Sequence, residues 1–396
     1  MSVTFPAGFR AAGVVAGFKP SGAPDLGLLV ADGSASAAGV FTTNAFRAAP
    51  VELCARRLAD GTTSAVLVNA GQANAATGET GTRDALRSTE EVAEALGVDA
   101  SAVLACSTGV IGEPLHMDEL LTGVPAVVRV LSTDGGPEFA QAIMTTDTVS
   151  KQATAQAGRY RVGGAAKGVG MIAPDLATML VFVTTDASVP PAAVHELATT
   201  VLEPAFESLS VDASTSTNDT VLLLASGAAG GDAVTPSSTA WSEVSSAIEA
   251  VASSLLDQLA ADAEGATHVL LVEISGAATT GQARIAAKAV ADSPLVKTAA
   301  FGGDPNPGRI LQAVGAAGIQ MDPARVDVAI GEVPVIRAGV VEPAYFAPGG
   351  DEQARAAMKE PQIAYRIRLG DGPGTSRVLG CDLSHDYVRI NGEYTT

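Results

Sequence analysis

Thr178 stands where residue type and position could combine to do chemistry. It follows a Gly-rich, Pro-containing stretch, KGVGMIAPDLA, and opens the apolar stretch TMLVFVTTDA. A threonine hydroxyl alone is a poor nucleophile, but a threonine at a chain start carries an α-amine that can act as its base. That amine titrates at about pH 8, within the useful range for general-base catalysis. Cleavage between Ala177 and Thr178 would therefore place a nucleophile and its base on one residue.

The Thr178 hydroxyl could also make this cut itself by attacking the Ala177 carbonyl. Cleavage and later acyl transfer would then share one oxyanion site. Pro174 biases the residue before it away from helix, which keeps the approach extended or turned. The alternative is that Thr178 is a β-branched residue opening a buried strand, and spacing alone favours that alternative.

A second segment that could take part in catalysis is CSTGV, Cys106 to Val110. The strand-like run SAVLACS leads into Thr108 and Gly109, where a sharp turn could expose backbone N–H groups as oxyanion donors. Losing one such donor costs a transition state about 3 to 4 kcal/mol. Taken alone, a turn that ends a strand is the simpler interpretation.

The charge balance limits the partners. The chain has 43 acidic and 24 basic residues, a formal net charge of −19, which repels phosphate backbones and anionic membrane surfaces. We therefore expect neither nucleic acid nor membrane as a partner. A small substrate bearing a carboxylate would need a local cation, and the candidates are Lys167 and Arg309. For either one alone, a solvated surface charge is the competing interpretation.

Composition indicates a soluble globular protein with one large core or two ordinary ones, since 47% of its 396 residues are hydrophobic. No apolar run approaches the roughly 20 residues that span a bilayer, and the N-terminus lacks the basic region of a secretory signal. We expect a cytoplasmic protein. Its four histidines show no ligand spacing, and we expect no metal. Three scattered cysteines predict neither a disulfide framework nor a zinc site: Cys54, Cys106 and Cys381.

Strand-like runs alternate with helical patterns, which predicts a mixed α/β architecture. The runs are SAVLVNAG, SAVLACSTGV, TMLVFVTTDA, TVLLLASG and HVLLVEISG. The clearest helix runs from Thr239 to Glu264 with one apolar stripe, and Gly265 would cap it in a left-handed conformation. Glu264 would lie in its last turn, where the helix dipole disfavours a carboxylate. This position suggests a functional role, and a solvated acid at a frayed helix end is the alternative.

Two further motifs carry less weight. GVGMIA, Gly168 to Ala173, matches a dinucleotide fingerprint, but we expect no clean strand before it, and Pro174 interrupts the helix that should follow. Asn218 in NDT fits a glycosylation sequon, yet a polar turn before the strand TVLLLASG is the simpler interpretation.

The stretch KGVGMIAPDLATML resembles the autocleavage segment of the ornithine acetyltransferases, also called glutamate N-acetyltransferases, of arginine biosynthesis. Further blocks resemble this family in the expected order along nearly the whole chain. They are SAAGVFTTN, CSTGVIGEPLHMDEL, IMTTDTVSK, STSTNDTVLLLASG, ADAEGATH, LVKTAAFGGDPNPGRI and YVRINGEYTT. In that family the precursor cuts itself before a threonine, which implies cleavage here between Ala177 and Thr178.

The resemblance also implies roles for individual residues. Thr178 would be the nucleophile, and Thr108 and Gly109 would form the oxyanion hole. A cation and an anion among the substrate-binding residues would suit a substrate with both a carboxylate and an amino group. The implied substrate-binding residues are Thr145, Lys167, Thr178, Glu264, Asn391 and Thr396.

For the fold, the resemblance implies layered mixed sheets with flanking helices, an N-terminal-nucleophile-like acetyltransferase with a second, smaller C-terminal domain. An α chain, 1–177, and a β chain, 178–396, would be interwoven in one structural unit, and two of each would form a heterotetramer. The implied reaction moves acetyl from N2-acetyl-L-ornithine to L-glutamate through an acyl-threonine and needs no metal or organic cofactor. Acetyl-CoA stays open as an additional donor.

Three alternatives stay open at this stage. A related self-processing amidohydrolase or aminopeptidase would pass the acyl group to water. A noncatalytic relative would fold without cleavage. A paralogue of the same fold in the clavulanate pathway would differ in substrate.

One position departs from the family, which usually has tryptophan where this chain has Pro307, in GGDPNPGRI. Proline removes a backbone donor and a large aromatic surface, so neighbouring contacts should differ. We predict that Pro307→Trp leaves self-cleavage intact, as measured by intact mass under denaturing conditions. Loss of the cleaved form in that variant would show instead that this loop supports the nucleophile.

Overall fold

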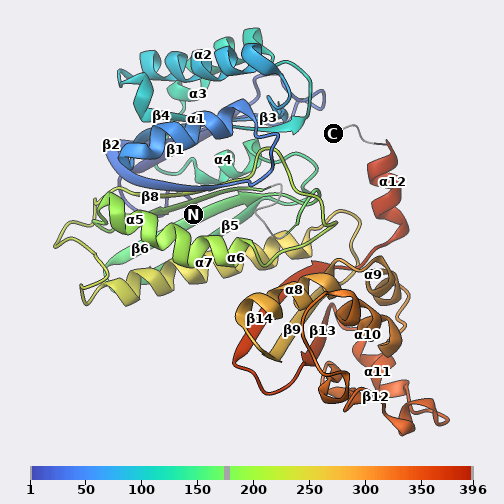
Figure 1. Cartoon of the computed structure of the whole chain (residues 1–396). Helices are drawn as coiled ribbons and strands as arrows, with labels where there is room; N and C mark the ends of the chain where they lie inside the picture. Colours follow the sequence, from blue (N-terminus) through green and yellow to red (C-terminus); the bar gives the residue numbers. More distant parts are fainter. Residues whose placement is uncertain (1, 174–178, 394–396) are drawn as a thin grey trace. The chain divides into compact units, whose positions relative to one another are not determined.

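The computed structural model describes residues 2–173 and 179–393, and the chain divides into two compact units. The larger unit comprises the residues up to 207 and 215–259, and the smaller one comprises 208–214 and the described residues from 260 onward. Both contain a β-sheet with helices (Figure 1). The predicted mixed α/β class with a smaller C-terminal domain is confirmed.

The larger unit contains eight strands in its described part. They are β1 (Phe9–Val14), β2 (Leu26–Phe41), β3 (Thr62–Gln72), β4 (Val103–Val110), β5 (Lys151–Ala157), β6 (Tyr160–Lys167), β7 (Leu180–Thr185) and β8 (Thr220–Ala225). Its helices are α1 (Ala49–Arg57), α2 (Gly78–Leu96), α3 (Met117–Arg129), α4 (Gly136–Ala142), α5 (Pro191–Leu197), α6 (Glu203–Phe206) and α7 (Trp241–Ala261).

These strands hydrogen-bond in the order β4-β3-β2-β8-β7-β6-β5, and β1 also pairs with β2. The register between β2 and β3 shifts between Val30 and Ala35. Before the shift β2 pairs with β1 and β3, and its last residues pair with β8. Val66 of β3 and Phe182 of β7 belong to one buried cluster, so the two halves of the sheet share a core. Helices α2 and α3 lie outside one half, and α5 and α7 outside the other (Figure 1).

All five predicted strand-like runs are strands: β3, β4, β7, β8 and, in the smaller unit, β9 (Val269–Ala277). β7 and β8 are buried along their whole length. Strands covered on both faces read as continuous apolar runs, which explains why these segments could be recognised from sequence.

The predicted helix from Thr239 to Glu264 is shorter than expected, because α7 ends at Ala261. Its stripe residues Val244 and Leu255 are buried as predicted. Glu264 therefore lies in a turn after the helix and not in its last turn. Gly265 has the left-handed conformation expected of it, with φ +65°. A Cβ there would lie 2.4 Å from the Tyr387 nitrogen, so the close approach of another segment also requires glycine.

The smaller unit is a six-stranded sheet in the order β12-β11-β10-β13-β9-β14. The strands after β9 are β10 (Asp327–Ile330), β11 (Val333–Arg337), β12 (Val340–Val341), β13 (Gln362–Arg368) and β14 (Gly374–Cys381). The helices are α8 (Thr280–Ala291), α9 (Pro294–Phe301), α10 (Pro307–Ala316), α11 (Glu352–Ala357) and α12 (His385–Glu393). Its core joins β9 and β13 to α8 and α10, with Val272, Ala287, Ile310 and Tyr365 among the buried residues.

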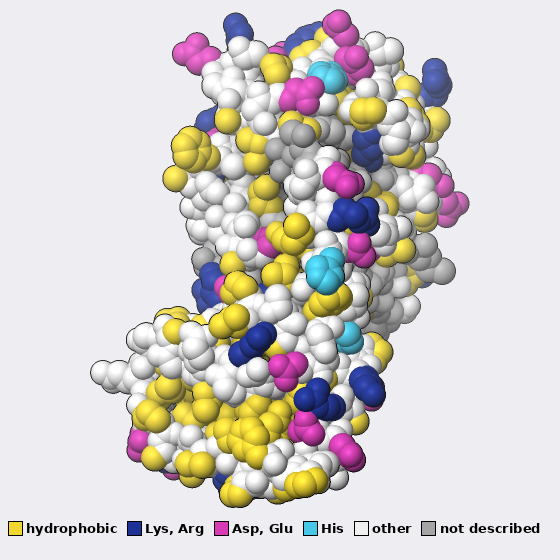
Figure 2. Space-filling model, turned by 90° about the vertical axis from the view of Figure 1, so that its right-hand side faces the viewer, with side chains coloured by type: hydrophobic (Ala, Val, Ile, Leu, Met, Phe, Trp, Pro, Cys, Tyr) yellow, Lys and Arg dark blue, Asp and Glu magenta, His cyan; other side chains and the backbone are white. Residues whose placement is uncertain are grey.

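Strands from both sides of residues 174–178 share the sheet of the larger unit, since β6 pairs with β7 from Val162–Thr185 to Lys167–Leu180. The two fragments predicted by cleavage at 177/178 remain a prediction. No helix of residues 2–173 and 179–393 is long and apolar enough to cross a membrane. On the face that Figure 2 shows, the described Lys and Arg side chains are scattered among acidic ones and form no continuous basic stripe.

Candidate active site

The predicted oxyanion residues, Thr108 and Gly109, lie near the end of β4. Thr108 is buried, with 3% of its surface exposed. Gly109 has φ +130°, and a Cβ at this position would lie 2.1 Å from the carbonyl oxygen of Gly71, its partner on β3. Only glycine can take this conformation so close to a neighbouring backbone. Both residues lie within β4 and pair with β3, so the sharp turn that the sequence predicted at this point is wrong.

Lys167 is the last residue of β6, and its ammonium donates a hydrogen bond of 3.2 Å to the Thr108 hydroxyl. The side chain is buried, with 2% of the residue exposed, so the interpretation of Lys167 as a solvated surface charge is wrong. Two residues given related roles by sequence therefore meet. A buried ammonium beside the end of β4 can bind a substrate carboxylate and stabilise negative charge.

A buried carboxylate organises the segment next to Lys167. Asp147 accepts a hydrogen bond of 2.6 Å from the Lys151 ammonium, and both side chains are 0% exposed. The same carboxylate accepts the backbone N–H of Gly168 at 2.9 Å and of Thr145 at 3.0 Å. Burial by itself would raise the pKa of Asp147, but the positive charges of Lys167 and Lys151 and these hydrogen bonds bring it below its usual value. Asp147 is therefore an anion that holds predicted site residues in place.

Asp219 immediately precedes β8 and is fully buried. Its Oδ1 accepts the backbone N–H of Met179 at 3.1 Å, and its Oδ2 has no hydrogen-bond partner among the described residues. Burial raises the pKa of this carboxyl well above its usual value, against the opposing effects of the Met179 N–H, Ser216, Lys167 and Thr42. A buried carboxyl with a raised pKa thus contacts the residue that follows Thr178.

Asn218 connects three segments at the same end of the sheet. Its side-chain nitrogen donates to the carbonyl oxygens of Ala73 at 2.6 Å and Ser107 at 2.8 Å. The residue is 5% exposed. A buried amide with both hydrogen atoms bonded agrees with a structural turn and not with a glycosylation site.

Of the two reasons expected against the dinucleotide interpretation of GVGMIA, the absence of a preceding strand is wrong and the absence of a following helix holds. A clean strand does precede it, because β6 ends at Lys167, directly before Gly168. Residues 168–173 form no helix, and the next described element is β7. The helix that a dinucleotide site requires is thus missing from the described residues that follow the strand.

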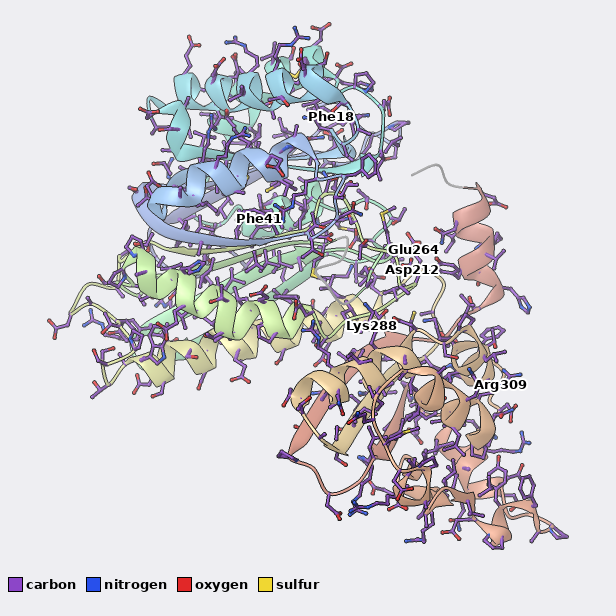
Figure 3. The ribbon with its side chains drawn as sticks, viewed as in Figure 1. Phe18, Phe41, Asp212, Glu264, Lys288 and Arg309 are labelled. Carbon is purple, nitrogen blue, oxygen red and sulfur yellow. The ribbon has the colours of Figure 1, made fainter. Side chains whose placement is uncertain are left out.

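In the smaller unit, Asn391 of α12 donates a hydrogen bond of 3.0 Å to Glu264. These two predicted substrate-binding residues therefore lie together. Tyr387, one helical turn before Asn391, donates to Asp212 at 3.2 Å. Burial and the charge of Asp212 raise the Tyr387 pKa, so the phenol stays protonated. Figure 3 labels Asp212 and Glu264, two carboxylates of this unit that could attract an ammonium group.

The other candidate cation, Arg309, joins two helices of the smaller unit. Its guanidinium donates to the Leu295 carbonyl at 2.7 Å and to the Thr298 hydroxyl at 3.2 Å. Pro307 occupies the first turn of α10, where a missing N–H costs nothing, and Asn306 caps the helix by accepting the Arg309 N–H. The proline that departs from the family pattern thus starts a helix.

Three predicted site residues, Ala177, Thr178 and Thr396, lie outside the described residues. Sequence reasoning missed Asp147, Lys151 and Asp219. Asp219 could have been noticed as an acid directly before an apolar strand, and Asp147 and Lys151 as an oppositely charged pair four residues apart. No metal-binding group of three or more His, Cys, Asp or Glu side chains occurs within 2–173 and 179–393.

The chain matches the model of the ArgJ family over residues 10–396. It is 46% identical to the arginine biosynthesis bifunctional protein ArgJ of Symbiobacterium thermophilum, covering 100% of this chain and 98% of the relative. It is 45% identical to the protein of the same name from Thermobifida fusca, covering 100% of both. A crystal structure of arginine biosynthesis bifunctional protein argJ from Bacillus halodurans aligns with a TM-score of 0.51 and 36% identity, covering 54% of this chain and 98% of that one.

Asp219→Asn is expected to remove part of the pH dependence of stability. Because the Asp219 pKa is raised on folding, the folded chain keeps a proton that the unfolded chain loses above about pH 4. The stability from this group is complete below the unfolded pKa and is lost as pH rises toward the folded pKa. Urea unfolding between about pH 4 and 8 measures this, with Thr178→Ala in both proteins to keep a single chain. The free energy of unfolding of the protein with Asp219, minus that of the Asp219→Asn variant, should fall as pH rises. A difference that does not change with pH would contradict this assignment.

Proposed function

This chain belongs to the ArgJ family and is an acetyltransferase of arginine biosynthesis, and from that premise we propose that it moves acetyl from N2-acetyl-L-ornithine to L-glutamate. The products are L-ornithine and N-acetyl-L-glutamate. Thr178 is the proposed nucleophile, freed by self-cleavage of the bond to Ala177. Its own α-amine serves as the base.

The transfer proceeds in two half-reactions that share one acyl-enzyme. The Thr178 oxygen attacks the acetyl carbonyl and passes its proton to the α-amine. The carbon–nitrogen bond of the amide then breaks, and ornithine leaves with that proton on its nitrogen. The amine of glutamate next attacks the acyl-threonine ester, the carbon–oxygen bond breaks, and the proton lost by the amine returns to the threonine oxygen. Thr108 and Gly109 stabilise the oxyanion of each tetrahedral intermediate.

The observation that carries the proposal is the 3.2 Å contact between the Lys167 ammonium and the Thr108 hydroxyl. It joins the proposed carboxylate anchor to one of the two proposed oxyanion residues. Lys167 also ends the strand that leads into residues 168–178. A buried cation at this point favours an anionic substrate over a neutral one.

The remaining substrate contacts are proposed from the family resemblance. Glu264 and Asn391, 3.0 Å apart, present a carboxylate and an amide that suit an ammonium group. Thr145, held through its N–H by Asp147, and Thr396 complete the proposed set.

The proposal extends to assembly and conditions. Fragments 1–177 and 178–396 would form a heterotetramer of two α and two β chains in the cytoplasm. The reaction would need no metal or organic cofactor, because the α-amine moves the proton and backbone donors hold the oxyanion. Acetyl-CoA is proposed as a second acetyl donor, in keeping with the word "bifunctional" in the relatives' names.

Self-cleavage is tested by intact mass under denaturing conditions. Untagged wild type should give two fragments, 1–177 and 178–396. Thr178→Ala should give a single uncut chain. Without the threonine hydroxyl there is no attacking group for that bond. An uncut wild-type chain would eliminate the N-terminal threonine mechanism.

Acetyl transfer is tested with radiolabelled N2-acetyl-L-ornithine. Label should appear in glutamate in wild type and not in Thr178→Ala. Before glutamate is added, one equivalent of ornithine per site should be released as the acyl-enzyme accumulates. Label released as acetate at the same rate with and without glutamate would indicate a hydrolase instead of a transferase.

A further inference from the structure

The loop between β1 and β2 is held rigidly by one buried carboxylate. Asp25 accepts the backbone N–H of Ala16 at 2.6 Å, Gly17 at 3.1 Å and Lys19 at 2.9 Å, and it is 0% exposed. Its carbonyl oxygen accepts the Ala70 N–H of β3 at 2.8 Å. These bonds fix the backbone of Lys19 against the end of β3. None of the roles proposed above involves this loop.

The loop lies beside the end of β4 through its neighbour β3. A Cβ on Gly71 would be 2.8 Å from the carbonyl oxygen of Phe18, and Gly71 is the strand partner of Gly109. Phe18, labelled in Figure 3, is 2% exposed and stacks on His116 with ring centres 6.5 Å apart. Lys19 therefore follows a residue packed onto the strand pair that carries the proposed oxyanion residues.

Lys19 also shares an electrostatic environment with Lys167. Burial lowers the Lys19 pKa to about 8, Asp25 and Asp147 raise it, and the positive charge of Lys167 lowers it further. The geometry agrees, because Lys167 bonds Thr108 of β4, and Gly71 of the paired strand β3 packs against Phe18, which precedes Lys19. Lys19 therefore belongs to the same group of buried charges as the proposed carboxylate anchor.

The Lys19 ammonium itself is bonded to a neutral group. It donates to the Pro24 carbonyl oxygen at 2.5 Å, and it forms no ion pair with any carboxylate of the described residues. Asp25 directs its carboxylate oxygens to backbone N–H groups, and Asp147 binds Lys151. A partly buried cation without a direct anionic partner is costly unless an ion of opposite sign binds it. The Lys19 ammonium can therefore bind an anionic group of a ligand.

We infer that Lys19 is a specificity-determining residue that binds the second carboxylate of a dicarboxylate acyl acceptor. This inference rests on the proposed function. Acetylornithine offers one carboxylate and a terminal ammonium, whereas glutamate offers two carboxylates. Lys167 serves the carboxylate that both substrates share, and Lys19 supplies the additional cation that only the acceptor needs. It does so without taking part in bond making.

The test is Lys19→Met, which keeps the length of the side chain and removes its charge. The KM for glutamate should rise by about 10- to 100-fold, the range expected for losing a charge-assisted contact, while kcat at saturation changes little. The preference for glutamate over its neutral analogue glutamine should fall toward one. The release of ornithine in the donor half-reaction and self-cleavage should remain at wild-type levels.

Lys19→Arg supplies the rescue. It should restore the glutamate preference and remove the rise in glutamate KM that wild type is expected to show above about pH 8, because arginine stays charged. The other charged groups near the loop are unchanged in both variants: Asp25, Asp147, Lys167, Glu113 with His116, and Glu119, which packs at Gly17.

The matched control is Lys288→Met, which removes the charge of a half-buried lysine on α8. This variant should alter none of these readouts.

An unchanged glutamate KM and glutamine discrimination in Lys19→Met, with normal ornithine release, would overturn the inference while leaving the proposed function intact. Absence of ornithine release in wild type would instead remove the proposed function. If Lys19→Met does not fold, the pH profile of Lys19→Arg decides: a KM that still rises above about pH 8 as in wild type would overturn the inference.

Discussion

The buried carboxylate of Asp147 is the constraint on which the arrangement of the candidate site depends. It binds an ammonium from β5 and N–H groups from the end of β6 and from the segment after α4. Removing one partner of such a buried ion pair costs roughly 3 to 5 kcal/mol, because the other charge is left without compensation. A single anion therefore holds three segments in one geometry. Lys167 precedes Gly168, which donates to this anion, and so its position follows from the same constraint.

The pKa values of two buried acids near Lys167 shift in opposite directions for an identifiable reason. Burial disfavours the charged form of both, but Asp147 has two lysines near it, whereas Asp219 is bonded mainly to neutral groups. In a chain with a net charge of −19, attraction of a substrate anion must therefore depend on a few buried groups and not on the overall field.

The strands were predictable because burial on both faces leaves continuous apolar runs. The sharp turn predicted at Thr108 and Gly109 is wrong, because both residues lie within β4 and pair with β3. The end of α7 was misjudged by three residues: the unfavourable acids Asp262 and Glu264 lie outside the helix. The buried charges could not be predicted in the same way. Lys19, Asp147 and Lys167 come from separate segments, and only the packed sheet shows that they share one environment. In sequence, each reads as a solvated charge.

The close backbone packing at the end of β4 explains why long side chains from neighbouring segments supply the positive charge there. At Gly109 and Gly71 there is no room for a Cβ, because the neighbouring carbonyl oxygens lie within 2.1 and 2.8 Å of that position. Polar groups must therefore be delivered from adjacent segments by long side chains. Lysine and arginine both have stems long enough for this, and they differ in how their charge responds to pH. A lysine can lose its proton when partly buried, so the charge of Lys19 depends on pH in a range where that of an arginine would not.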